Sequence, residues 1–261
     1  MMEKAQREFK SFKVDHLEVN IYSNRSELGQ NAGLRVAEKL KELLAVQESV
    51  AMVFAAASSQ NEFLDTLSSV PGIDWPRVVA FHMDEYIGLP EKHPQLFANY
   101  LRSRIMDKVR PGRVFFLNSN PESPLAEVER YSKLLKEHPL DISCLGIGEN
   151  GHIAFNDPEF ADFNDPADVK VVAPNQISRM QQVHDGCFKG LADVPTKAFT
   201  LTIPVLTGAK WVFGAVPGST KKDAVQQTLA GPIATTCPAS ILRKHAHAVL
   251  FLDKDSAAEL E

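Results

Sequence analysis

The sequence predicts an α/β fold, with a doubly wound, mostly parallel sheet and helices on both of its faces. Short apolar runs alternate with longer segments of helical periodicity along most of the chain. One run, residues 49–57, is apolar almost throughout, which is typical of a strand covered on both faces. The 261 residues fit one large domain or two small ones. Because no linker rich in glycine and proline interrupts the alternation, we expect a single domain over 1–261.

The N-terminal half of the chain alternates between strand and helix. Residues 17–22 form a β-rich apolar run and predict the first strand. Ser26 is the expected N-cap of a helix, because apolar side chains recur near helical spacing from Leu28 to Leu44. The next expected elements are a strand at 49–57, a helix at 61–67 that ends at Pro71 and Gly72, a strand at 78–81 and a helix at 96–109.

The C-terminal half continues the alternation around one segment that lacks clear periodicity. Residues 114–117 predict a strand and residues 124–138 a strongly charged helix. A strand at 141–146 runs into a glycine-rich turn, whereas residues 155–195 contain many Asp, Asn and Pro residues and predict no regular element. The remaining expected elements are strands at 199–205 and 211–216, a helix at 221–229, a strand at 248–252 and a short terminal helix.

Charge and composition exclude several classes of protein. The formal net charge of −5 argues against a nucleic-acid partner, which would need a basic face. No window approaches 18 apolar residues and residues 1–8 do not resemble a signal peptide, so we expect no membrane partner. Cys144, Cys187 and Cys237 have no CxxC spacing, which predicts neither a disulfide framework nor a zinc site. These features favour a cytoplasmic location.

The first candidate site residues directly follow an expected strand. In parallel sheets, ligands bind at the carboxyl ends of the strands, near a switch in strand order. Asp84 and Glu85 follow the apolar run that begins at Val78. Partial burial there would raise the pKa of a carboxylate toward that of a working base. An exposed acidic pair or a helix N-cap is the simpler interpretation of an isolated Asp-Glu sequence.

The second candidate is the glycine-rich turn at residues 146–158. Three glycines within residues 146–151 permit a tight turn with its backbone close to a ligand. His152 titrates nearest neutrality and is the natural proton shuttle, and Asp157 could fix its tautomer. The Gly-x-Gly-x-x-Gly spacing also occurs in dinucleotide sites. A histidine and a carboxylate inside the turn suit proton transfer better than pyrophosphate binding.

Two further turns between a strand and a helix are candidates for binding an anion. Ser58, Ser59 and Gln60 offer hydroxyl and N–H groups, although an ordinary serine N-cap explains them equally well. Lys221 lies in a first helical turn, where its charge opposes the helix dipole unless an anion is near. Together these groups suit one phosphate ester. We expect no metal, because HExxH and paired cysteines are absent, and His245 and His247 read as a surface pair.

Taken together, the motifs resemble those of the glucosamine-6-phosphate deaminase family. Residues 83–90, with His93 and Pro94, resemble the first signature of that family, and residues 146–156 resemble the second. Gly218, Ser219 and Lys221 match the third. The resemblance extends from about residue 17 to the C-terminus with the motifs in the same order.

This resemblance implies an enzyme that isomerises and deaminates an amino-sugar 6-phosphate without nucleotide, metal or other cofactor. Glucosamine 6-phosphate would give fructose 6-phosphate and ammonia. His152, held by Asp157 and assisted by Asn150, would open the pyranose ring. Asp84 would then remove the C2 proton to give an enolamine. Lys221 and the turn at residues 58–60 would hold the phosphate.

The chain also departs from the family pattern at several of these positions. Asp157 stands where the family usually has a glutamate, and Asn150 stands where many members have an aspartate. An asparagine can orient a neighbour but cannot shuttle a proton. Residues 56–60 replace a Thr-Gly-Gly-Thr-Pro phosphate loop, and Arg179 is the nearest candidate for a phosphate-binding arginine. Family members range from monomers to hexamers, so a homo-oligomer is among the expected states.

Two alternatives stay open at this point. A 6-phosphogluconolactonase shares the fold and a Gly-His turn, but it usually has Thr-Ala-Ser after that turn and Asp-Glu-Arg at the earlier strand end. This chain has Ile-Ala-Phe-Asn at 153–156 and Asp-Glu-Tyr at 84–86, which favours the deaminase. The second alternative is a non-catalytic sensor of sugar phosphates, which Asn150, Asp157 and the altered phosphate loop suggest. No helix-turn-helix segment for DNA binding is apparent.

Overall fold

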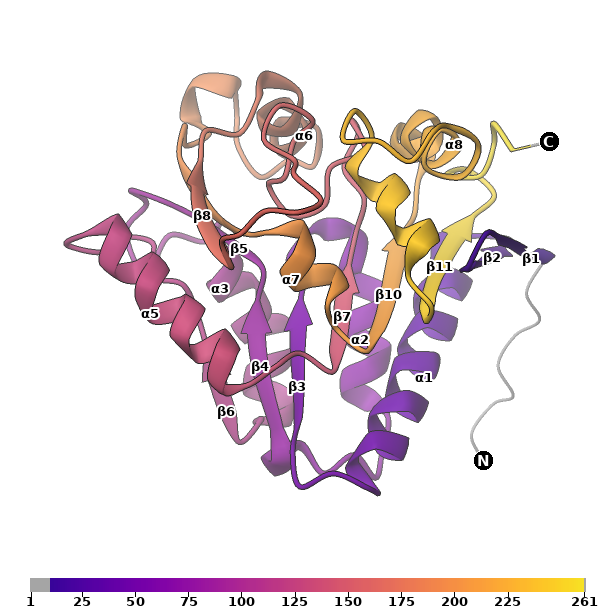
Figure 1. Ribbon diagram of the computed structural model, residues 1–261, viewed down its shortest axis with the longest axis horizontal. Coiled ribbons are helices and arrows are strands. Elements are labelled where there is room, and N and C mark those ends of the chain that lie inside the picture. The colour runs from indigo at the N-terminus through magenta and orange to yellow at the C-terminus, as the bar shows by residue number, and fades with distance from the viewer. Residues whose placement is uncertain (1–9, 261) are drawn as a thin grey trace.

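The computed structural model describes residues 10–260, which form an eight-stranded sheet flanked by helices (Figure 1). The sheet order is β1-β2-β11-β10-β7-β3-β4-β6, and every pair is parallel except the β1–β2 hairpin. Its strands are β1 (Lys10–Val14), β2 (Leu17–Tyr22), β3 (Val50–Phe54), β4 (Val78–His82), β6 (Arg113–Phe115), β7 (Ile142–Leu145), β10 (Trp211–Val216) and β11 (Ala248–Asp253). The predicted α/β class is confirmed.

The strand order reverses between β3 and β7, and this reversal positions the site. From β3 the chain adds β4 and β6 on one side, and then β7, β10 and β11 on the other. The turns that follow β3 and β7 therefore leave neighbouring strands in different directions, which opens a crevice at their carboxyl ends. A smaller antiparallel sheet, of order β5-β9-β8, contains β5 (Asp84–Tyr86), β9 (Ala198–Leu201) and β8 (Val169–Val172).

Helices cover both faces of the large sheet, as expected for a doubly wound fold. In β3, Val50, Met52 and Phe54 belong to one buried cluster, whereas Ala51 and Val53 belong to another. The helical elements that pack in the first cluster are α1 (Arg25–Leu44), α2 (Asn61–Ser69) and α3 (Phe97–Leu101), which continues through η3 (Arg102–Met106) into α4 (Asp107–Val109). The elements in the second are α5 (Pro124–Glu137), α7 (Ile203–Thr207), α8 (Lys222–Ala230) and η6 (Pro238–Lys244).

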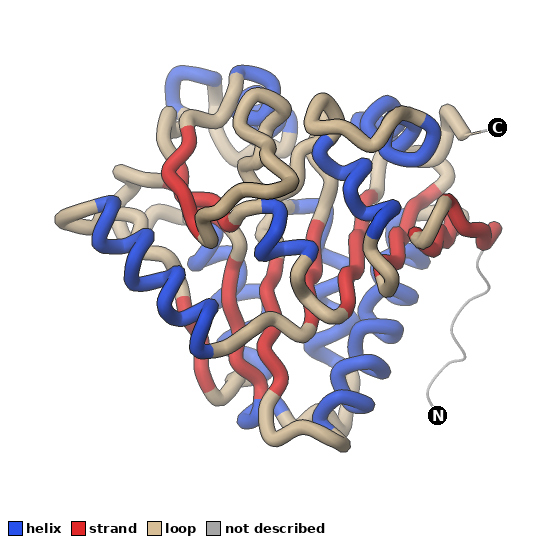
Figure 2. The backbone as a smooth tube through the Cα atoms, viewed as in Figure 1, coloured by secondary structure: helices blue, strands red, loops and turns tan. Residues whose placement is uncertain are grey.

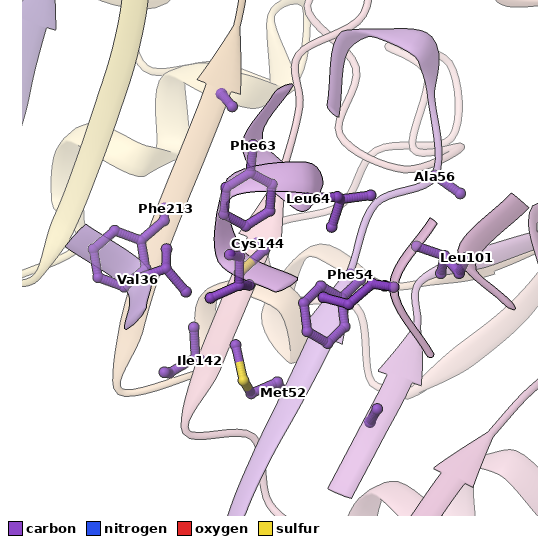
Figure 3. Close-up of a cluster of buried hydrophobic side chains, with 14 of the residues drawn as sticks. Val36, Met52, Phe54, Ala56, Phe63, Leu64, Leu101, Ile142, Cys144 and Phe213 are labelled. Atoms are coloured by element: carbon purple, nitrogen blue, oxygen red, sulfur yellow. The ribbon is translucent and has the colours of Figure 1, made fainter. Parts of the chain in front are cut away.

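The first cluster packs three central strands against α1 and α2 (Figure 3). Phe54 of β3, Cys144 of β7 and Phe213 of β10 lie beside Val36 of α1 and Phe63 of α2. All five side chains are at most 3% exposed. Burial of a large apolar side chain contributes about 1.5–3 kcal/mol, so this layer holds the strand ends that carry the site in a fixed arrangement.

Three of the expected elements differ in the structure. The N-cap of α1 is Asn24, whose side chain accepts from the Glu27 N–H at 3.0 Å, and not Ser26. The strand expected at 199–205 ends at Leu201, because Pro204 cannot donate a ladder hydrogen bond and suits the first turn of α7. The expected terminal helix is a series of turns after β11.

The elements that the sequence did not predict are short or polar. They are β1, β5, β8, α6 (Gln176–His184) and α7, together with the 3-10 turns η1 (Ser58–Gln60), η2 (Trp75–Arg77), η4 (Leu191–Asp193), η5 (Ser219–Lys221) and η6. Three of them, β8, α6 and η4, lie in the segment 155–195. Within residues 10–260, no helix combines the length and the apolar character needed to cross a membrane. The expected single domain also includes residues 1–9 and 261, which lie outside the described residues.

Candidate active site

A cavity lies at the reversal in strand order, where loops gather above the carboxyl ends of the strands (Figure 2). The turn after β3, the start of β5, the turn after β7 and helix α6 all contribute to its lining. Asp84 and His152 both line this cavity, together with Ser59 and Gln60. Side chains from four distant parts of the chain therefore meet in one place.

Asp84 reaches the cavity because a strand turns its neighbouring side chains to opposite sides. In β5, Asp84 pairs with Thr200 of β9 and lines the cavity. The next side chain, Glu85, is fully buried and accepts the N–H groups of Tyr86, Phe97 and Ala98 at 2.9, 3.1 and 2.9 Å. Glu85 thus anchors the start of α3, and this anchoring fixes the strand that presents Asp84.

The carboxylate of Asp84 is buried without a partner. Its residue is 8% exposed, and the side chain accepts no hydrogen bond from any group within residues 10–260. Burial, and secondarily the charge of Glu85, raise the pKa of Asp84 well above its usual value. A carboxylate in this condition holds a proton more tightly than one in water, which suits a general base.

The turn after β7 holds the His152 ring against the backbone. A Cβ atom at Gly148 would lie only 2.0 Å from His152 Cε1, so any side chain at this position would overlap the ring. Gly151 has a φ of +81°, and its carbonyl accepts the Ala239 N–H at 2.9 Å, which ties the turn to η6. Ala154, which also lines the cavity, has a φ of +51°, a strained value for a residue other than glycine.

The His152 ring is oriented by a set of polar groups around Nδ1. Asn150 Oδ1 lies 2.6 Å away, Ser178 Oγ 2.8 Å and Asp157 Oδ1 3.3 Å. Asp157 is fully buried and accepts hydrogen bonds from Asn150 Nδ2 at 2.9 Å, from the Asn175 N–H at 2.8 Å and from Ser178 Oγ. Burial by itself would raise the pKa of Asp157, but the hydrogen bonds and charge of its partners lower it to about 2.

The four predicted phosphate-binding residues do not all reach the cavity. Ser59 and Gln60 line it, but the Gln60 Nε2 already donates to Ser59 Oγ and to the Ala215 carbonyl, both at 3.0 Å. Ser58 instead donates to the Asp185 carboxylate at 3.2 Å. Lys221 is buried, and its Nζ has no partner within residues 10–260.

Lys221 lies within the electrostatic influence of Asp185. Burial lowers the pKa of Lys221, and the charges of Asp185 and Glu149 act against that shift. Asp185 therefore links Ser58 and Lys221, which come from different turns of the chain. Neither Ser58 nor Lys221 lines the cavity, and the acid that acts on both is Asp185.

Helix α6 supplies the site residues that sequence reasoning missed. Gln181 and Gln182 line the cavity, and Gln181 Oε1 accepts the Glu149 N–H at 3.0 Å. Ser178 contacts His152, and Asp185 follows the last residue of the helix. One signal for this helix was Asn175, a favoured N-cap residue whose side chain accepts the Ser178 N–H at 2.9 Å.

Other polar candidates lie away from this chemistry. Arg179 donates to the carbonyls of Leu191 and Val194 at 2.7 and 2.8 Å, which fixes α6 to η4. His247 is exposed and stacks on Trp211 at the start of β10, far from the carboxyl ends of the strands. No group of three or more His, Cys, Asp or Glu side chains within residues 10–260 is arranged to hold a metal ion.

Comparisons with known proteins show the family of this chain. The family model described as glucosamine-6-phosphate isomerases/6-phosphogluconolactonase matches residues 23–251. A glucosamine-6-phosphate deaminase of Streptococcus sanguinis is 34% identical over 234 residues, which cover 89% of this chain and 96% of that protein. The deaminase of Exiguobacterium sibiricum is 32% identical over 188 residues, with 72% and 73% covered.

Solved structures of both enzymes named in the family description are similar in fold to this chain. The structure of a monomeric glucosamine-6-phosphate deaminase superposes with a TM-score of 0.84 at 28% identity, covering 92% of this chain and 98% of that one. The 6-phosphogluconolactonase of Thermotoga maritima superposes with a TM-score of 0.74 at 18% identity, covering 91% and 100%. The second likeness shows a shared fold alone.

Proposed function

This chain belongs to the family of glucosamine-6-phosphate isomerases and 6-phosphogluconolactonases, and we propose that it converts glucosamine 6-phosphate and water into fructose 6-phosphate and ammonia. Relatives that carry the deaminase name, at 32–34% identity, support this choice within the family. The observation that carries the proposal is that Asp84 and His152 line the same cavity. The reaction needs two proton-transfer groups around one sugar, and this cavity offers two.

In the first step, His152 opens the pyranose ring. Asn150 and Asp157 surround Nδ1, which leaves Nε2 as the free nitrogen of a ring that lines the cavity. Nε2 takes the proton of the O1 hydroxyl and returns a proton to the ring oxygen as the C1–O5 bond breaks. The product is the open-chain aldehyde, and the histidine is unchanged at the end of the step.

In the second step, Asp84 moves the proton from C2 to C1. The carboxylate takes the C2 proton, the C–H electrons form the C1–C2 double bond, and the aldehyde oxygen takes a proton from the substrate's own C2 ammonium group to give the enolamine. Return of a proton to C1 gives an iminium at C2, to which water adds as ammonia leaves. General base catalysis of this kind contributes about 10²–10⁴-fold. The burial that raises the pKa of Asp84 supports this role.

Lys221 and the turn at Ser58 are proposed to bind the phosphate. The unpartnered Lys221 Nζ is a buried cation, and a phosphate would supply its missing counter-charge. Binding at this remote group orients the sugar for the two proton transfers. Asp185 must move aside first, because it accepts from Ser58 in the ligand-free protein.

The size of the cavity supports a movement of α6. Its volume is about 60 Å³, whereas pockets for small molecules are about 300–1,000 Å³. Gln181 and Gln182 of α6 line it, so a displacement of this helix would admit the sugar.

The test uses the purified protein with four substrates in separate reactions. Glucosamine, galactosamine and N-acetylglucosamine 6-phosphates and 6-phosphogluconolactone are supplied while ammonia and ketose phosphate are measured. We expect equal amounts of ammonia and fructose 6-phosphate from glucosamine 6-phosphate. The variant Asp84→Asn removes the proposed base in the same assay. Its matched control is Asp223→Asn, which changes an exposed acid of α8.

Two outcomes would overturn this proposal in different ways. Hydrolysis of the lactone without release of ammonia would assign the chain to the lactonase reaction of the same family. Binding of the amino-sugar phosphates without turnover would indicate a sensor.

A further inference from the structure

The Ser178 hydroxyl makes polar contacts in the site that the sequence motifs do not account for. It is 1% exposed, lies in the first turn of α6 and belongs to none of the sequence motifs. Its hydroxyl lies 2.8 Å from His152 Nδ1 and also within hydrogen-bond distance of Asp157 Oδ1. The carboxylate itself is 3.3 Å from Nδ1. The hydroxyl is therefore closer to the imidazole than the acid that is expected to orient it.

The donors and acceptors around Nδ1 can be assigned by counting protons. Asp157 only accepts, so the single Ser178 proton goes to Asp157 Oδ1. Asn150 donates its amide Nδ2 to Asp157, which turns Oδ1 of Asn150 toward the ring. The oxygen atoms of Ser178 and Asn150 that face Nδ1 are then both acceptors. Nδ1 must carry the hydrogen, and Nε2 must be the basic nitrogen.

We propose that Ser178 is a positioning residue that relays the charge of Asp157 to His152 and fixes the Nδ1–H tautomer needed for ring opening. The hydroxyl accepts from Nδ1 and donates to Asp157, so it bridges a gap that the carboxylate does not close. The same turn of α6 also gives the Asn175 N–H to the other oxygen of Asp157. Helix α6, which lies above the carboxyl ends of the strands in Figure 1, thereby builds the histidine part of the site and also lines the cavity.

This inference rests on the proposed ring-opening role of His152, and a matched pair of variants isolates the hydroxyl. Ser178→Thr keeps the hydroxyl, and Ser178→Val has nearly the same shape without it. Because the hydrogen bonds involve charged groups, we expect Ser178→Val to lower kcat about 10- to 100-fold relative to Ser178→Thr, with KM changed by less than about threefold. Equal kcat values for the two variants would overturn the inference.

A double variant tests whether Ser178 bridges the gap between His152 Nδ1 and the Asp157 carboxylate. Ser178→Ala leaves space beside Asp157, and Asp157→Glu adds one methylene that brings the carboxylate toward Nδ1. The double variant is expected to recover at least about fivefold of the kcat lost in Ser178→Ala, as contacting residues are coupled. A double variant that is no faster than Ser178→Ala would contradict the bridge. Thermal unfolding of each variant checks that the fold is retained.

A spectroscopic measurement separates this inference from the proposed function. The ¹⁵N shifts of the His152 ring are recorded at alkaline pH in the wild type and in Ser178→Val. The wild type is expected to show one tautomer with the proton on Nδ1. Ser178→Val is expected to show a smaller excess of the same tautomer, because Asn150 Oδ1 still lies 2.6 Å from Nδ1. A wild-type ring protonated on Nε2 would refute the relay whatever the activity. Absence of wild-type deamination, with the Nδ1–H tautomer present, would instead refute the proposed function.

Discussion

The cavity is bounded by two walls whose acids have opposite surroundings. The base wall is the start of β5 with Asp84. The histidine wall is His152, which lines the cavity, together with the three residues around its Nδ1, Asn150, Asp157 and Ser178. Both acids are buried, at 8% and 0% exposure. Asp84 accepts no hydrogen bond from residues 10–260, whereas Asp157 accepts from three neighbours, Asn150, Asn175 and Ser178. The pKa of Asp84 is raised and that of Asp157 is lowered.

Because both residues are aspartates, their different roles in the proposed mechanism follow from their surroundings and not from the residue type. A carboxylate that must take a proton is kept without partners, and one that must stay charged is surrounded by donors. The two arrangements also have opposite effects on folding. A buried charge without hydrogen bonds destabilises the folded state, whereas a buried charge that accepts several hydrogen bonds stabilises it. The comparison can therefore be tested through stability as well as activity.

Asp84→Asn should have the largest effect on turnover. Loss of the base is expected to lower kcat by about 10³-fold, within the usual range for general base catalysis. The same variant should raise Tm at neutral pH, because an amide is less costly to bury than a carboxylate. Since the folded pKa is raised, the gain should disappear below the pKa of the unfolded state, about 4. A lower Tm than that of the Asp223→Asn control would contradict the inference that the buried Asp84 carboxylate destabilises the fold.

Asp157→Asn should show the opposite effect on stability. With its pKa lowered from 3.8 to about 2, the ionised acid stabilises the fold by about 2 kcal/mol at neutral pH. This contribution is present above pH 4 and is lost as the pH falls toward 2. We expect kcat to fall about 100-fold, because the histidine loses its orientation. Urea unfolding at neutral and acidic pH measures the loss, and equal stability of variant and wild type at neutral pH would contradict it.

Lys221 is a buried cation, and its Nζ has no hydrogen-bond partner among the residues that the structure describes. Lys221→Met is expected to raise KM about 10- to 150-fold, since a hydrogen bond to a charged group is worth about 1.5–3 kcal/mol. It should also raise the Tm of the ligand-free protein. Lys222→Met is the control, because that neighbouring lysine is half-exposed and pairs with Glu259 at 2.6 Å. Equal KM values for the two variants would remove Lys221 from the site.

Asp185 should give the smallest effect. Its carboxylate lies beside Ser58 and acts on Lys221, where it would repel a phosphate. Asp185→Asn is expected to lower KM about fivefold, as two like charges near a protein surface repel by roughly 1 kcal/mol. Asp193→Asn, at an exposed acid of η4, is the control. A higher KM in Asp185→Asn would show that the acid assists binding.

The sequence predicted the sheet and the turns that carry Asp84 and His152, because parallel strands have strong apolar patterns and place their ends together. It did not predict helix α6, which lines the cavity together with these turns. Helix α6 has nine residues in a polar segment, and its inward side chains, among them Ser178 and Gln181, touch groups far away in the chain. Such contacts arise from tertiary structure, and local patterns do not encode them. The isolation of the Asp84 carboxylate likewise depends on what surrounds it after folding.

In the proposed mechanism the two walls act independently on one sugar, and proton exchange in D₂O separates their roles. Asp84→Asn is mixed with glucosamine 6-phosphate, and anomer interconversion and deuterium at C2 are followed by NMR. We predict that the variant still accelerates interconversion, because the histidine wall is intact, while C2 gains no deuterium and no fructose 6-phosphate forms. Deuterium at C2, or loss of the accelerated interconversion, would contradict the account.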